Sequence, residues 1–491
     1  MRAAHESRRY ASTPGALGTA VFDTLDGWIG DDARMTTFDS LALPAELRPG
    51  LDALDLTTMT PIQSAALPDI LAGADVIAQA PTGSGKTVAF SLGLLRGIDA
   101  TQWRTQGLVL CPTRELATQV AGQVRKLATG IANLKVSLLC GGMSLEPQIA
   151  SLQQHDPHIV VGTPGRVQEL MRKKHLHLAG VRVLVLDEAD RLLDMGFADV
   201  VKEIVGKTPP KRQTLLFSAT YDDAVRELAA ALQQDPKEHR VEGDSEPDIL
   251  ERFYEVELAA KPATLAALLQ KETPESCVVF CNTRQDTRAV VDELGKRRFS
   301  CATLHGEMEQ RDRDEVLLRF ANRSLRVLVA SDVAARGLDI AGLAMVVNYE
   351  LPTDLASYLH RIGRTARAGE SGVALSLVTP REMPRALALE RERDKPLRWK
   401  SAPSPSTKTN DSMQAAMTCL RIDAGKTDKL RPGDILGALT GDAGLPASAV
   451  GKIDVFPTRS YVAITRDHAK QALDRLQTKG IKARKRRVTR L

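Results

Sequence analysis

Two short stretches carry residues that could bind and cleave a nucleoside triphosphate. The first is APTGSGKT, which follows the apolar run DVIAQ and precedes a helical stretch. In such a loop the backbone N–H groups wrap phosphates, and the next helix adds the partial positive charge of its start. Lys86 would reach the terminal phosphates and the Thr87 hydroxyl would bind Mg²⁺. The loop residues predicted to contact the nucleotide are Ala80, Pro81, Thr82, Gly83, Ser84, Gly85, Lys86 and Thr87. A strict phosphate-binding loop has glycine where Ala80 stands, so the pattern departs at one residue.

The second stretch is VLVLDEAD, residues 183–190, in which an apolar strand delivers Asp187 and Glu188 to its end. Asp187 can hold Mg²⁺ beside the phosphates. Glu188 can position and deprotonate an attacking water. The alternative is a loop of solvated acids, which fits poorly because the preceding strand is too apolar to be exposed.

HRIGRTARAG, residues 360–369, places three arginines in ten residues of the second half of the chain. It could be a plain basic turn. Phosphoryl transfer offers another use, because an arginine that stabilises the charge of the transition state is worth roughly 10³–10⁵ in rate. Arginines from one half and a phosphate loop from the other predict a composite site that ATP closes and hydrolysis releases.

The surrounding pattern predicts an α/β fold with two tandem domains. Continuous β-branched runs such as GLVLCP and HIVVGTP alternate with amphipathic stretches, which is typical of parallel strands buried on both faces. The rhythm restarts after the polar stretch 235–248 with SCVVFCNT and LRVLVASD. Polar residues follow the strands at their carboxyl ends, where open parallel sheets bind ligands. The predicted boundaries are an extension of disordered character over 1–34, domains over 35–240 and 248–395, a linker over 396–410 and a third domain over 411–491.

Composition indicates a soluble globular protein of three or so domains, with 491 residues, 26% of them charged and 43% hydrophobic. Residues 411–491 hold 16 Lys and Arg against 8 Asp and Glu, although the whole chain carries only +5. The last segment therefore either meets an anionic partner or is a solvated basic tail. The six scattered cysteines predict a reducing cytoplasm, and no apolar run approaches the ~20 residues of a membrane span.

From Phe38 to about Pro380 the chain resembles the DEAD-box RNA helicases in the order and spacing of nearly a dozen motifs, including DEAD at residues 187–190. The resemblance implies two RecA-like domains, ATP and Mg²⁺ as cofactors, and RNA-stimulated ATP hydrolysis. Positions matched to the family's nucleotide and coupling residues are Phe38, Thr60, Gln63, Ser218, Thr220, Gly337, Asp339, His360, Arg364 and Arg367. By this resemblance Phe38 stacks on adenine and Gln63 reads the edge of adenine. Asp55 and Leu56 stand where the family usually has glycine and an aromatic residue, which predicts a slight alteration of adenine recognition.

The same resemblance implies an RNA site on both domains. The matched positions are Thr113, Arg114, Gly142, Thr163, Gly165, Arg166, Thr283, Gln310, Arg313, Ser331 and Asp332. Small residues, hydroxyls and helix starts let the backbone approach a phosphate chain, and such contacts carry little base information. The implied partner is therefore single-stranded RNA of any sequence, distinguished from DNA by its 2′-hydroxyls.

The last segment reads as β-α-β-β-α-β, the ferredoxin-like arrangement that RNA-recognition (RRM-like) modules use. The stretch SYVAIT offers only Tyr461 for stacking, so phosphate contacts would dominate. The residues predicted to bind RNA here are Lys452, Arg459, Tyr461, Arg484, Lys485 and Arg486. LRPGDILGALTGDAGL and the strands after it resemble the C-terminal domain of a bacterial subfamily that recognises 23S ribosomal RNA. That implies a helicase addressed to large-subunit assembly.

Three alternatives stay open. The chain could be an ATP-gated RNA clamp without turnover, although both loops and all the arginines are present. It could be a DNA helicase, which Gln63 and the DEAD sequence disfavour. It could also be a general RNA chaperone whose last domain binds RNA without ribosomal specificity. ATPase activity with RNA, with DNA and with unrelated RNA separates the three.

Overall fold

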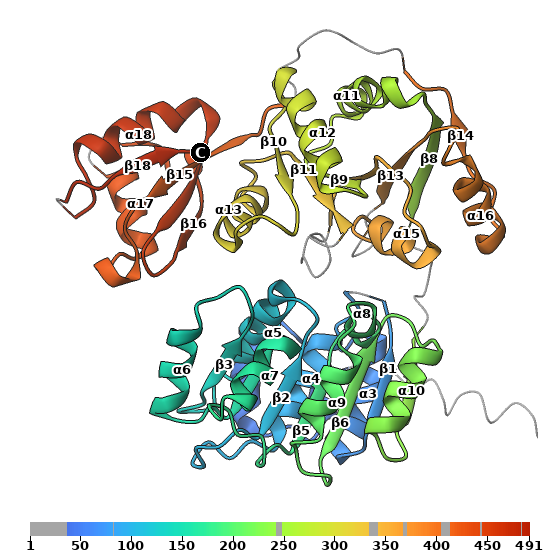
Figure 1. The fold of residues 1–491 in the computed structure, drawn as a ribbon. Coiled ribbons are helices and arrows are strands. Elements are labelled where there is room, and N and C mark those ends of the chain that lie inside the picture. The colour runs from blue at the N-terminus through green and yellow to red at the C-terminus, as the bar shows by residue number, and fades with distance from the viewer. Residues whose placement is uncertain are drawn as a thin grey trace, which may run out of the picture.

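The computed structural model describes residues 37–491 except 82, 242–247, 333–341, 367–370, 404–412, 442–443 and 483. Within these ranges the chain forms three sheets, each with its own helices (Figure 1). Two sheets have seven parallel strands and the third has four antiparallel strands. The predicted fold class, two RecA-like domains followed by an RRM-like domain, is confirmed.

The first sheet has the strand order β3-β4-β2-β5-β6-β1-β7. Its strands are β1 Val76–Gln79, β2 Gly107–Leu110, β3 Val136–Leu139, β4 Ile159–Gly162, β5 Val183–Leu186, β6 Gln213–Ser218 and β7 Lys237–Arg240. Its helices are α2 Arg48–Asp52, α3 Pro61–Ala72, α4 Lys86–Arg96, α5 Arg114–Leu127, α6 Leu145–Gln154, α7 Pro164–Arg172, α8 Ala189–Asp194, α9 Ala198–Val205 and α10 Asp223–Leu232. Val109 packs into one core and its neighbours Leu108 and Leu110 into another, so helices cover both faces of the sheet.

The second sheet repeats the design in the order β10-β11-β9-β12-β13-β8-β14. Its strands are β8 Ile249–Glu255, β9 Cys277–Cys281, β10 Cys301–Leu304, β11 Val327–Ser331, β12 Met345–Asn348, β13 Gly372–Val378 and β14 Trp399–Lys400. Its helices are α11 Lys261–Glu272, α12 Arg284–Lys296, α13 Gln310–Ala321, α15 Leu355–Ile362 and α16 Met383–Arg393. The carboxyl ends of both sheets face each other, which brings their loops to one interface (Figure 1).

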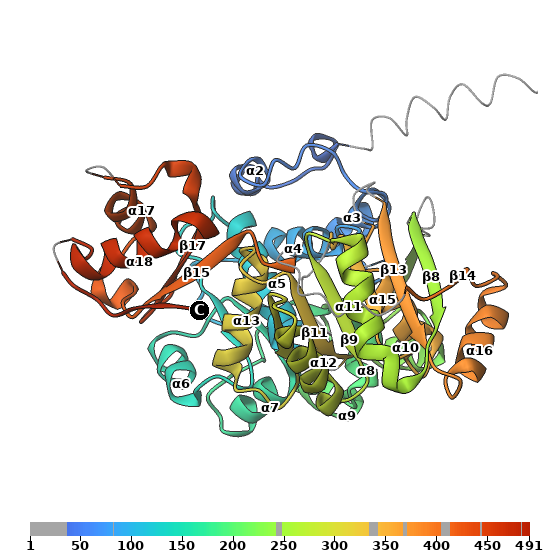
Figure 2. The same ribbon diagram turned by 90° about the horizontal axis from the view of Figure 1, so that it is seen from above.

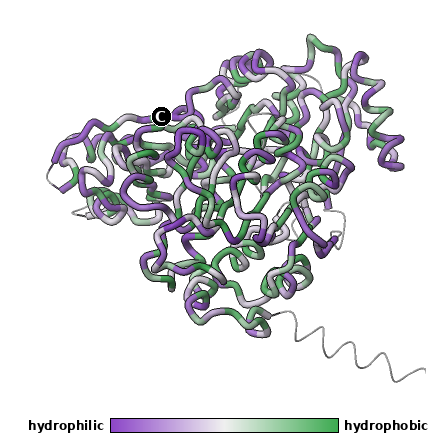
Figure 3. Tube along the Cα trace, turned by 60° about the horizontal axis from the view of Figure 1, so that its bottom comes forward, coloured by the Kyte–Doolittle hydropathy of each residue, from purple (hydrophilic) through white to green (hydrophobic). Residues whose placement is uncertain are grey.

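The third domain has the predicted order β-α-β-β-α-β and the strand order β16-β17-β15-β18. Its elements are β15 Met417–Ile422, α17 Pro432–Thr440, β16 Val450–Val455, β17 Ser460–Thr465, α18 Ala469–Thr478 and β18 Val488–Arg490. Both ribbon views place this domain beside α13 of the second domain (Figures 1 and 2). Hydrophobic segments gather inside all three domains, and hydrophilic segments run along the outside (Figure 3).

The boundary between the second and third domains differs from the predicted linker over 396–410. Trp399–Lys400 forms β14, which pairs with β8 at the edge of the second sheet. Met413 is fully buried in the core of the second domain, and its carbonyl accepts a hydrogen bond from Ser300 N at 3.0 Å. A strand of two residues and a single buried side chain leave no periodic pattern in the sequence, so neither contact was predictable from it.

No helix among the described residues is long and apolar enough to span a bilayer. All six cysteines are free thiols, and five of them are buried.

Candidate nucleotide site and RNA interface

The phosphate loop lies between β1 and α4 and is shaped by glycines with positive φ. Gly83 has φ +88° and Gly85 has φ +94°, a region that side chains rarely adopt. A Cβ at Gly85 would lie 2.4 Å from Gln63 Nε2 and 2.8 Å from Thr60 Oγ1. Gly85 therefore lets the loop approach α3. It is also the N-cap of α4, whose first backbone N–H groups are free to bind an anion.

Thr60 and Gln63, at the start of α3, bind the backbone of this loop through their side chains. The Thr60 hydroxyl donates to Ser84 O at 2.7 Å, and Gln63 Nε2 donates to Gly85 O at 3.0 Å. Gln63 Oε1 accepts from Thr60 N at 2.9 Å, which completes the cap of α3. Gln63 therefore supports the loop, and because its amide keeps a second N–H and a second lone pair, the contact with adenine stays a prediction.

Phe38 differs from its predicted place. Its side chain is 1% exposed and belongs to the core of the first domain. No face of the ring is open to stack on a base in this arrangement. The ring is apolar and shares its core cluster with buried aliphatic side chains, so packing in the core outweighs exposure at the nucleotide site.

The loop fits a phosphate chain. Lys86 is buried, and burial lowers the pKa of its ammonium group. The charge of Asp187 raises that pKa, but burial has the larger effect. Its Nζ donates to the carbonyls of Ala80 and of Pro81, the latter at 3.3 Å. Ser84 Oγ is buried and has no hydrogen-bond partner among the described residues. A buried cation and an unsatisfied hydroxyl suit an anionic group at this loop. Thr82 lies outside the described residues.

Asp187 and Glu188 stand at the end of β5, on the side of Lys86. Asp187 is 3% exposed, and burial, followed by the charge of Glu188, raises the pKa of Asp187 to about 7. Glu188 adopts φ +50° at the start of α8, a strained conformation for a residue with a side chain. That turn aims Glu188 at Arg191, whose Nε lies 3.4 Å from Glu188 Oε2. Thr87, partly exposed at the first turn of α4, and Asp187 are the residues that fit a divalent cation.

Asp190 connects this strand end to Ser218 and Thr220 at the end of β6. Asp190 N donates to Ser218 Oγ at 3.3 Å. Asp190 Oδ2 accepts from Thr220 N at 3.2 Å and from the Thr220 hydroxyl at 3.3 Å. Ser218 is thus bonded to the backbone of Asp190 and Thr220 to its carboxylate, so both predicted coupling residues are attached to the stretch that carries Glu188.

The second domain brings His360 and Arg364 against the first domain. A small space lined by Arg191 of the first domain and by Asp332, His360 and Arg364 of the second shows that the two face each other. Arg364 is 8% exposed. Arg364 and Arg191, the ion-pair partner of Glu188, therefore line one space between the two domains, and the composite nucleotide site stays a prediction. Gly337, Asp339 and Arg367, which were also predicted here, lie outside the described residues.

The predicted RNA residues begin helices at the carboxyl ends of strands. Thr113, Thr163 and Thr283 are the N-caps of α5, α7 and α12. Helix starts offer free N–H groups and partial positive charge to phosphates. Gly142 has φ +71°, and a Cβ added at Gly165 would meet nothing within 4 Å, so the backbone is open at both positions. Arg166 lies beside them and donates to Met143 O at 3.0 Å.

Arg114, Gln310 and Arg313 meet across the interface between the first two domains. Arg114 Nη2 lies 3.0 Å from Asp314 Oδ2, and Arg313 Nη2 lies 3.0 Å from Glu115 Oε1. Gln310 Nε2 donates to Asp314 Oδ1 at 2.9 Å. Glu115 and Asp314 were not singled out in the sequence, although both lie within one residue of a predicted RNA residue.

Arg361 is a third residue that was not singled out in the sequence, although it stands inside HRIGRTAR. It is 2% exposed and holds Asp332 through two bonds, Nε to Oδ1 at 2.7 Å and Nη2 to Oδ2 at 2.6 Å. Its Nη2 also donates to Asn282 Oδ1 at 2.8 Å, and its guanidinium lies over Phe280. Arg361 therefore fixes the predicted RNA residue Asp332, and Ser331 at the end of β11 lies beside it.

In the third domain the predicted RNA residues divide into paired and unpaired groups. Lys452, Arg459 and Arg486 have carboxylate partners, at 3.5 Å, 3.9 Å and 3.1 Å. Arg484 and Lys485 are exposed, with no ion pair among the described residues. Tyr461 is only 7% exposed, and its hydroxyl donates to Glu315 of α13 at 3.1 Å. It cannot stack on a base in this arrangement.

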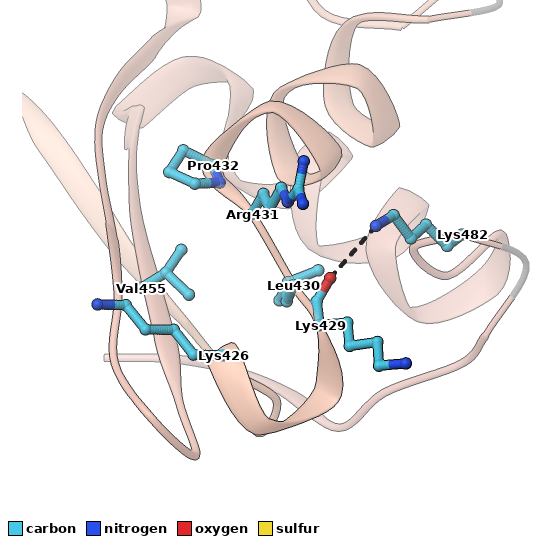
Figure 4. A pocket seen from close by; sticks show the side chains of 7 residues that line it. All are labelled: Lys426, Lys429, Leu430, Arg431, Pro432, Val455 and Lys482. Carbon is cyan, nitrogen blue, oxygen red and sulfur yellow. Dashed lines mark hydrogen bonds between the residues drawn. The ribbon is translucent and has the colours of Figure 1, made fainter.

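A basic hollow of about 780 Å³ opens at the start of α17 (Figure 4). It is lined by Lys426, Lys429, Leu430, Arg431, Pro432, Val455 and Lys482. Lys482 pairs with Asp434 at 2.7 Å, whereas Lys426, Lys429 and Arg431 have no ion pair in the described part of the chain.

Backbone bonds build the rim of the basic hollow in advance. Lys426 N donates to Phe456 O at 2.9 Å, and Thr427 N donates to Pro457 O at 2.9 Å. A Cβ at Gly425 would lie 2.1 Å from Phe456 O, so the close approach of these two loops requires glycine. A rim fixed by the fold loses little conformational entropy when it binds a ligand.

Comparison with known proteins agrees with this geometry. Family models match in order: DEAD/DEAH box helicase over residues 60–228, helicase conserved C-terminal domain over 260–369 and DbpA RNA binding domain over 419–490. The chain belongs to the DEAD-box RNA helicases, which use ATP hydrolysis to remodel RNA. Along its length it is similar to the ATP-dependent RNA helicase DbpA of Escherichia coli (strain K12), with 50% identity over 456 residues, 92% of this chain and 99% of that relative.

More distant relatives match about three quarters of the chain. DEAD-box ATP-dependent RNA helicase CshA of Bacillus cereus (strain ATCC 10987 / NRS 248) is 40% identical over 75% of this chain and 70% of its own length. The solved structure of S. cerevisiae Dbp5 bound to RNA and ADP BeF3 matches with a TM-score of 0.67 and 31% identity, over 77% of this chain and 96% of that one. RNA binding and ATP-dependent RNA helicase activity follow for this chain.

Proposed function

We propose that the helicase remodels structured 23S ribosomal RNA during assembly of the large ribosomal subunit, in the cytoplasm. The core, built from the first two domains, supplies ATP-driven work on RNA of any sequence. The third domain selects where that work is done. The observation that carries the proposal is the basic hollow, which offers three unpaired cations on a domain that matches an RNA-binding family.

For the nucleotide site, the residue roles follow from position and charge. Lys86 binds the terminal phosphates of ATP, and Thr87 with Asp187 holds Mg²⁺, which neutralises phosphate charge when bound. Glu188 takes the proton of the attacking water, and Arg364 stabilises the charge of the transition state from the second domain. The buried Lys86 and the unsatisfied Ser84 hydroxyl support this assignment.

The test compares ATPase rates against RNA concentration for a 23S ribosomal RNA fragment and for an unrelated structured RNA of equal length. We expect the ribosomal fragment to reach half-maximal stimulation at a much lower concentration. Equal concentrations would leave a helicase whose third domain is a general RNA tether, which is the second candidate function. No stimulation by either RNA would favour the ATP-gated clamp.

A matched pair of lysines tests the basic hollow itself. Lys429 lines the hollow and Lys470 lies on α18 outside it; both are exposed, with no ion pair among the described residues. Lys429→Ala should raise the concentration of ribosomal fragment for half-maximal stimulation. It should also make the slope of log affinity against log salt concentration shallower by about 0.7, the value expected for one single-strand phosphate contact. Lys470→Ala should change neither. Equal effects would place the RNA elsewhere on the domain.

A further inference from the structure

The two faces of the third-domain sheet have different neighbours. Leu420 and Ile422 of β15 point to the domain core, where they pack with Ile435 and Leu476 of the two helices. Strand side chains alternate between faces, so Arg421 points to the opposite face. RNA-recognition modules present stacking aromatics on that opposite face. In this protein the same face lies against the second domain.

Glu315 of α13 is the centre of this contact. Its Oε2 accepts a hydrogen bond from the Tyr461 hydroxyl at 3.1 Å and from Arg421 Nη1 at 3.4 Å. The side chains of Glu315 and Arg421 are only 20% and 19% exposed. Burial and the nearby charge of Glu315 raise the pKa of Tyr461, so its hydroxyl remains a donor at neutral pH. Partly buried charged hydrogen bonds of this kind are stronger than exposed ion pairs.

The contact continues at the far end of α13. Asn322 Nδ2 donates to Cys419 Sγ at 3.5 Å, and both side chains are buried. Met417 N donates to Arg323 O at 3.3 Å. The third domain is thus attached to α13 at its middle and at its C-terminus, by side-chain and backbone bonds together.

The first turn of the same helix holds two of the predicted RNA residues and faces the first domain. Gln310 and Arg313 contact Glu115 of the first domain, at 3.4 Å and 3.0 Å. Asp314 faces the first domain, and its neighbour Glu315 faces the third. A helix of 12 residues is about 18 Å long. Helix α13 of the second domain therefore contacts both the first and the third domain.

We propose that the sheet face of the third domain is a docking surface for α13, and that Glu315 and Arg421 are positioning residues that hold bound RNA at a fixed reach from the core. This inference rests on the proposed address function of the third domain. A docked domain presents its RNA to Gln310 and Arg313 at a high effective concentration, whereas a domain on a free linker dilutes it. The stacking platform of an RNA-recognition fold is thereby used for intramolecular contact.

The first experiment measures RNA-stimulated ATPase of the full chain with a 23S ribosomal RNA fragment and with an unrelated RNA. Glu315→Ala should raise the concentration of ribosomal fragment for half-maximal stimulation roughly tenfold. It should leave the maximal rate and the response to unrelated RNA unchanged. The charge exchange Glu315→Arg with Arg421→Glu should recover at least part of the loss. An unchanged ribosomal response in Glu315→Ala, or no recovery in the exchange, overturns the proposal.

The second experiment needs no ribosomal preference, so it separates this inference from the proposed function. Asn322→Cys places a thiol opposite the native Cys419, and mild oxidation should join the two in the docked chain. Asn322→Cys with Cys419→Ser is the matched control. We expect mass spectrometry to detect the disulfide. We also expect the oxidised chain to retain its stimulation by RNA. Absence of the disulfide, or loss of stimulation once it forms, overturns docking. Equal responses of the unaltered chain to both RNAs would instead refute only the ribosomal address.

Discussion

Arg114 of the first domain pairs with Asp314 of the second, with Nη2 3.0 Å from Oδ2, and the neighbouring residues Glu115 and Arg313 form a second pair with the charges reversed. Each domain thus contributes one arginine and one carboxylate. Both arginines were predicted to bind RNA, and in the structure each pairs with a carboxylate of the other domain.

The two ion pairs should contribute different amounts of free energy to the contact between the first two domains. Arg114–Asp314 is exposed, at 20% and 48%, whereas Arg313–Glu115 is exposed at only 12% and 15%. An exposed pair contributes about 0–1 kcal/mol, and a desolvated charged hydrogen bond about 1.5–3 kcal/mol. Asp314→Asn should therefore raise the RNA concentration for half-maximal ATPase less than about fivefold, and Glu115→Gln about tenfold or more. The reverse order would contradict this ranking.

Glu188→Gln should stop hydrolysis and leave ATP and RNA binding in place. The amide keeps the size of the carboxylate but cannot accept a proton, so roughly 10²–10⁴ in rate should be lost. Phosphate release and nucleotide binding measured on one preparation check both halves. Substantial residual turnover would refute the general-base role of Glu188.

Arg364→Ala should lower the maximal hydrolysis rate roughly 10³-fold or more while ATP affinity without RNA changes little. The guanidinium comes from the second domain and acts only when the two domains meet. Single-turnover hydrolysis and equilibrium nucleotide binding provide the comparison. An equal loss in both would mean that Arg364 binds ATP in the ground state.

Gly85→Ala should weaken ATP binding at least about tenfold, because a Cβ at φ +94° is strained by roughly 1–2 kcal/mol and meets Gln63 at 2.4 Å. Gly97, at the other end of α4, has φ −107° and nothing within 4 Å of a Cβ. Gly97→Ala is the matched control and should leave ATP binding unchanged. Equal nucleotide affinity in the two variants would show that the loop tolerates the extra atom.

Asp187→Asn should stabilise the nucleotide-free protein at pH 8 more than at pH 5. Because the pKa of Asp187 is raised to about 7 in the folded state, against about 3.9 unfolded, folding takes up a proton between these values. Stability from this group is present below pH 4 and is lost as pH rises toward 7. The asparagine side chain does not ionise, so the variant does not lose this stability as pH rises. Thermal unfolding at the two pH values checks it, with roughly 2–4 °C in Tm for each kcal/mol. A larger gain at pH 5 would contradict the raised pKa.

The sequence was sufficient for the central strands and insufficient at the sheet edges. β2, β5, β9 and β11 are continuous apolar runs because helices cover both faces. The pattern missed β3, β7, β8 and β14, and all but β8 lie at the ends of their sheets. β7 reads KEHR with three exposed residues, since an edge strand needs backbone pairing more than burial.

The candidate site shows a similar division. The position of Lys86 near Asp187 and Glu188 was predictable, because both motifs follow strands whose carboxyl ends lie at one edge of a parallel sheet. The places of Gln63 and Tyr461 were not, because each is decided by a partner far away in the sequence: Gly85 for Gln63 and Glu315 for Tyr461. Arg361 was hidden for the same reason, since its carboxylate partner is Asp332.

Met413 precedes β15 in the sequence yet fills the core of the second domain. Removing a buried side chain of this size costs about 2–5 kcal/mol. A chain truncated before residue 411 would lose this side chain together with the third domain, and its second domain would be weakened on its own account. Deletion experiments should therefore end after Ala416, so that a loss of RNA response reports the absent domain and not a damaged neighbour.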